Sequence, residues 1–145
     1  MRGSTTLKKA AAVPRLLLGL IFVFFGANHL HAFLPSGPPQ TGPAGEFMHA
    51  FMVTHYSFIV GLCEVIPGLL LLINRFVPLA LLILGPVIVN ILLVGFLMAP
   101  MGLPAGIVVA VLWVVVFWQV RSAFAGVFRA RAGLPTDGGT AGPLH

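Results

Sequence analysis

One stretch of the chain, from Phe76 to Leu97, contains no charged side chain and only one polar one, Asn90. A helix of about 20 such residues crosses the roughly 30 Å hydrocarbon core of a bilayer. Three further stretches that are predominantly apolar, each with a single Arg or Glu, occur at about 14–34, 55–73 and 105–124. The hydrocarbon core contains no water that could hydrogen-bond the backbone. The N–H and C=O groups of each stretch must therefore bond one another, as they do in a helix. The sequence therefore predicts an all-α, membrane-embedded protein with four spans.

Composition supports this class and excludes others. The 145 residues are 59% hydrophobic and only 8% charged, with a mean hydropathy of +1.06, whereas roughly a quarter of the residues in soluble domains are charged. The net charge of +5 does not indicate a nucleic-acid partner, because the basic residues are scattered between apolar stretches and form no stripe. The single cysteine, Cys63, excludes an internal disulfide and a Cys-x-x-Cys motif.

The chain begins with a basic segment, residues 1–13, that precedes the first apolar stretch. This arrangement resembles a signal peptide, but no small-residue cleavage site follows, so we expect a retained helix from about Pro14 to Leu34. Pro14 suits a first helical turn, where its missing N–H would have had no partner.

Two further segments are predicted to lie outside the spans. Residues 35–54 begin with a run rich in proline and glycine, Pro35 to Glu46, which must be a loop. Gly45 to Thr54 then forms a short interfacial helix before the second span. The C-terminal tail, 129–145, is rich in Gly, Pro and Thr and is expected to be disordered.

The loops also determine a topology. Asn74 and Arg75 form so short a turn that the third span must return along the second, which predicts an antiparallel four-helix bundle. All basic residues then fall on one side: Arg2, Lys8, Lys9, Arg15, Arg75, Arg121, Arg129 and Arg131. By the positive-inside rule both termini are cytoplasmic, and the protein lies in the inner (cytoplasmic) membrane.

The second span contains the acid Glu64 among apolar residues. An acid at the centre of a span costs about 3 kcal/mol, but each Leu, Ile, Val or Phe returns about 0.3 to 0.6, so the span still inserts. Gly61, Glu64 and Gly68 share one face of this helix. Gly19 and Gly26 share one face of the first helix, and such small-residue faces allow helices to approach closely. We therefore expect Glu64 to point into the bundle.

The candidate pocket consists of Glu64, Asn90 and His29, with Tyr56 above it towards the outer side. An ionisable group at membrane depth is expensive, so Glu64 is either a proton- or ligand-binding group or a hydrogen-bonded packing residue. For Asn90 the favoured interpretation is a side chain that makes a hydrogen bond between helices. No cluster of nucleophile, base and orienting residue appears, so the chain is at most a subunit of an oxidoreductase.

Histidines His31, His49 and His55 are the remaining candidates for a metal or haem. His29 and His31 are two residues apart, and His49 and His55 are six apart, so neither pair faces one ligand on a continuous helix. A metal site is therefore the less favoured interpretation, and haem is less favoured than quinone.

Two motifs resemble the DoxX family of small four-helix membrane proteins. Residues 15–30 (RLLLGLIFVFFGANHL) are similar to its opening signature, and residues 61–70 (GLCEVIPGLL) with 74–80 (NRFVPLA) are similar to its second span and following turn. The resemblance covers Arg15 to Phe128. Arg15, Gly19, Gly26 and Glu64 match the family pattern by position, whereas the histidine that many relatives have late in the third helix is replaced by the sequence Val94-Gly-Phe96.

The resemblance implies a redox association, because the family's namesakes belong to a membrane thiosulfate:quinone oxidoreductase and other members to oxidative-stress complexes. Three functions are therefore considered. The first is an accessory or quinone-linked subunit that binds a partner oxidoreductase. The second is a small solute or proton carrier that uses Glu64 and Asn90. The third is a structural or assembly protein without a ligand. For each of these functions, a second copy of the chain is a candidate partner.

Overall fold

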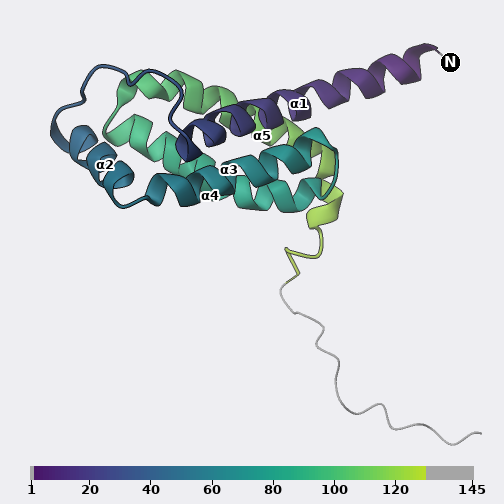
Figure 1. Ribbon diagram of the computed structural model, residues 1–145. Helices are drawn as coiled ribbons and strands as arrows, with labels where there is room; N and C mark the ends of the chain where they lie inside the picture. Colours follow the sequence, from purple (N-terminus) through teal and green to yellow (C-terminus); the bar gives the residue numbers. More distant parts are fainter. Residues whose placement is uncertain (1, 130–145) are drawn as a thin grey trace, which may run out of the picture.

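The computed structural model of the chain describes residues 2–129 and contains, within them, helices and no strand. Its α-helices are α1 (Arg2–Leu30), α2 (Gly42–Val53), α3 (Tyr56–Leu72), α4 (Val77–Leu97) and α5 (Leu103–Val120). Two 3₁₀ turns, η1 (Pro100–Gly102) and η2 (Arg121–Phe124), flank α5. The all-α prediction is confirmed, and α1, α3, α4 and α5 lie side by side (Figure 1).

Three of these helical segments are long and apolar enough to cross a membrane: α1, α4 and the segment Pro100–Phe124. The fourth candidate is a bent pair, α2 and α3, whose axes differ by 82°. With 17 residues, α3 is about 25 Å long at about 1.5 Å per residue, at the short end of what spans a bilayer. The number of candidate spans is therefore three, or four if the bent pair counts as one.

The first helix differs from the prediction at both ends. It begins at Arg2, so residues that we expected to form a separate basic segment are helical, and Pro14 lies inside the helix instead of in its first turn. Residues 7–12 are Leu, Lys and Ala, all strong helix formers, which offset the one hydrogen bond that Pro14 removes. The helix ends at Leu30, because the Asn28 side-chain oxygen accepts the N–H groups of Phe33 and Leu34 at 3.1 and 2.9 Å.

The connection between α1 and α3 contains more helix than expected. α2 begins at Gly42, which has a φ of 66°, and Pro43 lies in its first turn, so the last part of the predicted loop is helical. His55, with a φ of 56°, separates α2 from α3 in the left-handed conformation. This residue produces the sharp change of direction that lays α2 across the end of the bundle (Figure 1).

The other predicted helices agree more closely. α3 and α4 begin and end within one residue of the predictions, and the turn between them places Asn74 and Phe76 at positive φ. The last helix was predicted over 105–124, but it begins at Leu103 and becomes 3₁₀ after Val120. The predicted disordered tail lies, apart from Arg129, outside the described residues.

The core lies between α1, α3, α4 and α5 and extends to η2. Its fully buried side chains are mostly leucine and valine, with one proline: Leu18, Leu71, Leu81, Leu84, Val116 and Pro67. The Trp113 indole N–H donates to the carbonyl of Leu81 at 3.0 Å, which ties α5 to α4. Many large apolar side chains on the outside remain exposed, as expected of helices that face lipid.

Candidate functional site

A polar pair lies between the first and third helices. The Glu64 carboxylate oxygen Oε2 is 2.7 Å from the His29 ring nitrogen Nδ1. The Glu64 side chain is 4% exposed and the His29 side chain 27%. A buried acid is tolerated only when it is hydrogen-bonded, and His29 supplies that bond. Sequence reasoning named both residues, and the structure brings them into direct contact.

Close backbone packing makes this contact geometrically feasible. Gly26 of α1 lies against Gly61 of α3: a Cβ atom on Gly26 would be 2.8 Å from the Cβ of Glu64 and 3.0 Å from the carbonyl oxygen of Gly61. His29 and Glu64 each follow one of these glycines by three residues and so share its helix face. The missing side chains let the two helices approach closely enough for the pair to form.

A second glycine contact continues this interface. A Cβ on Gly19 would be 2.9 Å from the carbonyl oxygen of Gly68, and a Cβ on Gly68 would be 3.0 Å from that of Gly19. Beyond it, the Arg15 guanidinium donates to the carbonyl of Leu71 near the end of α3. A cation there also complements the partial negative charge of a helix C-terminus. We call this contact, from Arg15 to His29 on α1, the glycine seam.

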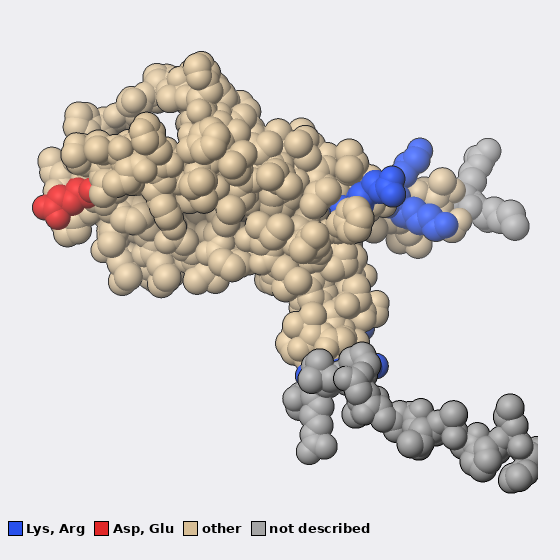
Figure 2. All heavy atoms as spheres, turned by 60° about the horizontal axis from the view of Figure 1, so that its bottom comes forward, with Lys and Arg blue, Asp and Glu red and all other residues tan. Residues whose placement is uncertain are grey.

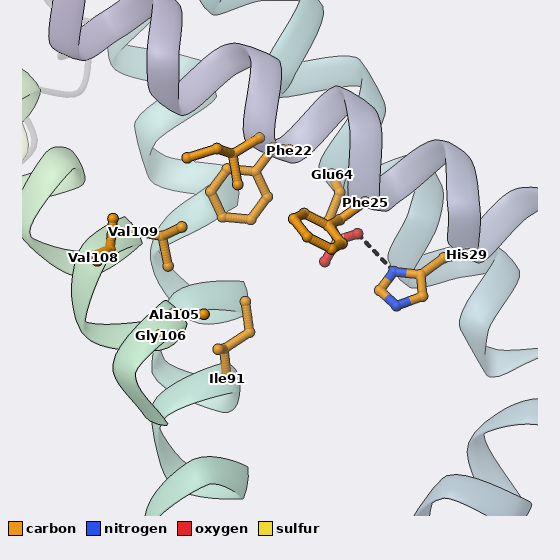
Figure 3. A pocket seen from close by; sticks show the side chains of 10 residues that line it. Phe22, Phe25, His29, Glu64, Ile91, Ala105, Gly106, Val108 and Val109 are labelled. Atoms are coloured by element: carbon orange, nitrogen blue, oxygen red, sulfur yellow. Dashed lines mark hydrogen bonds and ion pairs between the residues drawn. The ribbon is translucent and has the colours of Figure 1, made fainter. Parts of the chain in front are cut away.

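The first cavity opens beside the pair, between α1, α4 and α5, and has a volume of about 370 Å³. Figure 3 shows Phe22 and Phe25 of α1 on one wall, Ile91 and Val109 across from them, and Glu64 with His29 at one end. The remaining lining residues are Ile21, Ala105, Gly106 and Val108, all apolar. The cavity therefore presents one polar pair in otherwise hydrocarbon surroundings.

A second, smaller cavity of about 200 Å³ lies on the other side of the same pair, towards α2. It brings together three of the residues that the sequence singled out, Glu64, His29 and Asn90. Within the described residues the Asn90 side chain has no hydrogen-bond partner. Phe47, Met48 and Phe51 line this cavity on the α2 side, and the Phe51 ring packs edge-on against the His29 ring at a centroid distance of 5.5 Å.

The other predicted residues do not join the pair. Tyr56 is 56% exposed and contacts the ring of Phe51 instead of lining either cavity. His31, His49 and His55 are exposed, and His31 lies beyond the end of α1. In the part of the chain that the structure describes, no three His, Cys, Asp or Glu side chains come close enough to hold a metal ion.

Sequence reasoning missed most walls of the first cavity. Phe22 lies on the helix face that Gly19 and Gly26 share, but Phe25, Ile91 and the α5 residues were not singled out. The available signal was the pair of small residues Ala105 and Gly106 at the start of the last span. Small residues there leave space opposite Phe22 and Phe25, but the facing helix is not identifiable from periodicity alone.

No protein-family model, curated protein or solved structure matches this chain. The resemblance to the DoxX family therefore stays a prediction.

The chemistry of the site follows from the polar atoms of His29 and Glu64 that do not take part in the hydrogen bond between them. One oxygen of Glu64 and one ring nitrogen of His29 are engaged with each other, which leaves the second carboxylate oxygen and Nε2. These atoms can accept or donate a hydrogen bond to a carbonyl or hydroxyl group. The pair can also hold a proton on either residue. The site is therefore suited to binding a polar head and exchanging a proton with it, inside an apolar environment that strengthens both interactions.

Proposed function

We propose that this protein is a DoxX-like antiparallel four-helix membrane bundle that binds a quinone at the His29–Glu64 pair. It acts as an accessory subunit of a membrane redox system, together with a partner oxidoreductase, and is not a complete enzyme by itself. The observation that carries the proposal is the first cavity, whose only polar lining residues are that pair.

The order of contacts along the glycine seam supports the antiparallel arrangement of α1 and α3. The earlier glycine of α1, Gly19, lies against the later glycine of α3, Gly68, and Gly26 lies against Gly61. The short turn after α3, closed by a hydrogen bond from the Arg75 N–H to the Leu70 carbonyl at 3.0 Å, supports the same relation for α3 and α4.

The distribution of charge supports the orientation with both termini in the cytoplasm of the cell and the protein in the inner membrane. Lys and Arg side chains gather at one end of the molecule, and acidic side chains are visible only at the other end (Figure 2). Lys8 and Lys9 lie on the part of α1 that extends beyond the bundle, and Glu46 lies on α2. By the positive-inside rule the basic end is the cytoplasmic one.

The cavity fits a quinone in shape and chemistry. Phe22 and Phe25 offer aromatic faces for a flat ring, and aromatic pairs gain about 0.5 to 1.5 kcal/mol beyond burial. Phe25, Ala105 and Val108 are exposed, so an apolar molecule dissolved in lipid reaches the cavity between α1 and α5 without crossing water. At its end, His29 or a protonated Glu64 donates to a ring carbonyl. Bound quinone supplies the electron chemistry, and this chain supplies orientation and a proton.

The test is binding of a short-chain ubiquinone analogue to the full chain in lipid nanodiscs, measured by titration calorimetry. Glu64→Gln is expected to weaken affinity at least about tenfold, equivalent to about 1.4 kcal/mol. Glu46→Gln is the matched control, because it makes the same chemical change at an exposed site on α2, and it should bind normally.

Circular dichroism of each variant establishes that it is folded. If the wild-type chain binds no quinone and its solvent extract contains none, the proposal fails. In that case, solute or proton flux in proteoliposomes that depends on Glu64 would indicate a carrier. Full tolerance of Glu64→Gln in every assay would indicate a structural or assembly role.

A further inference from the structure

The second cavity has properties that an apolar ligand site does not require. It lies at membrane depth beside α4, yet it holds three polar side chains, those of His29, Glu64 and Asn90. Asn90 is exposed where it lines the cavity, and its amide has no hydrogen-bond partner among the described residues, so this amide is available to bond with a molecule in the cavity.

Water can form this bond. A water molecule needs roughly 30 Å³ of space and two to four polar partners. The second cavity has a volume of about 200 Å³ and three polar side chains on its walls. Several waters can therefore connect the Asn90 amide to the His29–Glu64 pair, whereas the apolar walls of the first cavity favour a dry ligand.

The α2 residues on its walls place the second cavity towards one end of the molecule. Its walls from α2 are Phe47, Met48 and Phe51, and α2 lies across the end of the molecule opposite the free, basic end of α1 (Figure 1). The only titratable side chains on its walls are His29 from α1 and Glu64 from α3, and α2, α4 and η1 contribute none. A proton that leaves the pair through this cavity therefore meets no other titratable side chain on its walls.

We propose that the second cavity is a hydrated vestibule that gives the His29–Glu64 pair proton access from the α2 end, with Phe51 as its gate. This inference deepens the proposed function, on which it rests for the ligand in the first cavity. In the exchange step, the pair releases one proton to a vestibule water, and that proton passes to the solution at the α2 end. The reverse transfer reloads the pair, and no electron moves in either direction.

Phe51 is the gate because of its position. Its side chain is buried, and its ring contacts both the His29 ring and the Tyr56 ring, at 5.5 and 5.7 Å between centroids. It thus separates His29 from the exposed surface near Tyr56. α2 is joined to α3 by Thr54 and the left-handed His55 alone, and opening of the gate that we propose would use this short link as its hinge.

Thiol accessibility tests the vestibule without any quinone. In a Cys63→Ala background, Asn90→Cys places a thiol on the vestibule wall, and Val89→Cys places one on the outer face of the same helix, where Val89 is 55% exposed and lines neither cavity. A charged, membrane-impermeant thiosulfonate reacts with thiolate, which forms in water and not in lipid. Proteoliposomes with the reagent on one side at a time report the direction of access.

We expect Asn90→Cys to react at least about tenfold faster than Val89→Cys from the α2 end, and Phe51→Ala to accelerate it further. Val94→Cys, on the same wall, replaces Asn90→Cys if that variant does not fold. Equal rates at positions 89 and 90, or faster reaction from the basic end, would overturn the proposal. Normal vestibule reactivity in a chain that binds no quinone would leave the vestibule standing and refute only the ligand.

Discussion

α1 has two very different neighbours. Against α3 it packs backbone to backbone along the glycine seam, where added Cβ atoms would lie within 3.0 Å of the facing helix. Towards α5 it leaves a cavity of about 370 Å³ between aromatic side chains and small residues. The same helix therefore provides a rigid contact on one side and an open, apolar space on the other.

The close packing against α3 and the loose packing towards α5 have different consequences for the site. Close packing at the seam holds His29 and Glu64 at hydrogen-bonding distance, because both side chains project from helix turns next to a glycine contact. Loose packing beside α5 leaves room for a molecule to reach that pair. A site needs both: ligands bind best to groups that are already held in position.

The largest effect is expected from filling the seam. Gly26→Leu introduces a side chain whose first atom already overlaps Glu64 and Gly61, so the helices must separate. Overpacking typically costs about 1 to 3 kcal/mol, and here loss of the buried pair adds to that cost, so we expect the folded state to be lost or severely destabilised. The denaturation midpoint in mixed micelles, followed by circular dichroism, measures it.

Gly3→Leu is the control for this change. Gly3 lies on the same helix and has nothing within 4 Å of an added Cβ. If Gly26→Leu proved as stable as Gly3→Leu, the seam would not be the close contact that the structure describes.

The next largest effect is expected from breaking the polar pair. His29→Leu leaves the buried Glu64 carboxyl without its partner, which costs about 2 to 3 kcal/mol. The double variant His29→Leu, Glu64→Leu removes both polar groups and should recover most of that loss. His49→Leu, an exposed position, should be close to neutral. Strictly additive single effects in this double-mutant cycle would contradict a direct interaction.

A smaller effect on stability, but a clear one on binding, is expected on the α5 side. Ala105→Leu adds volume to the cavity wall at an exposed position, so stability should change by less than about 1 kcal/mol. Quinone affinity should fall at least about tenfold, because the added side chain occupies ligand space. Val111→Leu, exposed on the same helix and outside both cavities, is the matched control. Unchanged affinity in Ala105→Leu would place the ligand elsewhere.

The smallest effect is expected at a glycine outside the seam. An added Cβ on Gly85 of α4 would meet only Trp113, at an ordinary 3.7 Å. Since alanine is favoured over glycine in a helix by roughly 0.5 to 1 kcal/mol, Gly85→Ala should be neutral or slightly stabilising. Destabilisation by more than about 1 kcal/mol in the same denaturation assay would show that glycines in this bundle are sensitive wherever they lie.

Helix positions were largely predictable because they depend on local properties. Apolar length and the Pro- and Gly-rich segments placed α3 and α4 almost to the residue. The ends of α1 were missed for local reasons too: strong helix formers extend it before Pro14, and hydrogen bonds from the Phe33 and Leu34 N–H groups to the Asn28 side-chain oxygen end it early. Neither effect changes which residues are apolar, so hydropathy does not reveal it.

The sequence by itself determined that the chain is all-α, apolar enough for a membrane, and carries one acid on a glycine-lined helix face. Periodicity suffices for these features, because each depends on spacing within a single helix. Only the tertiary structure decided that His29 is the partner of Glu64, that Asn90 joins them in the second cavity while Tyr56 does not, and that the first cavity opens towards α5. These features depend on the distance and rotation between helices, which side chains from several segments set together.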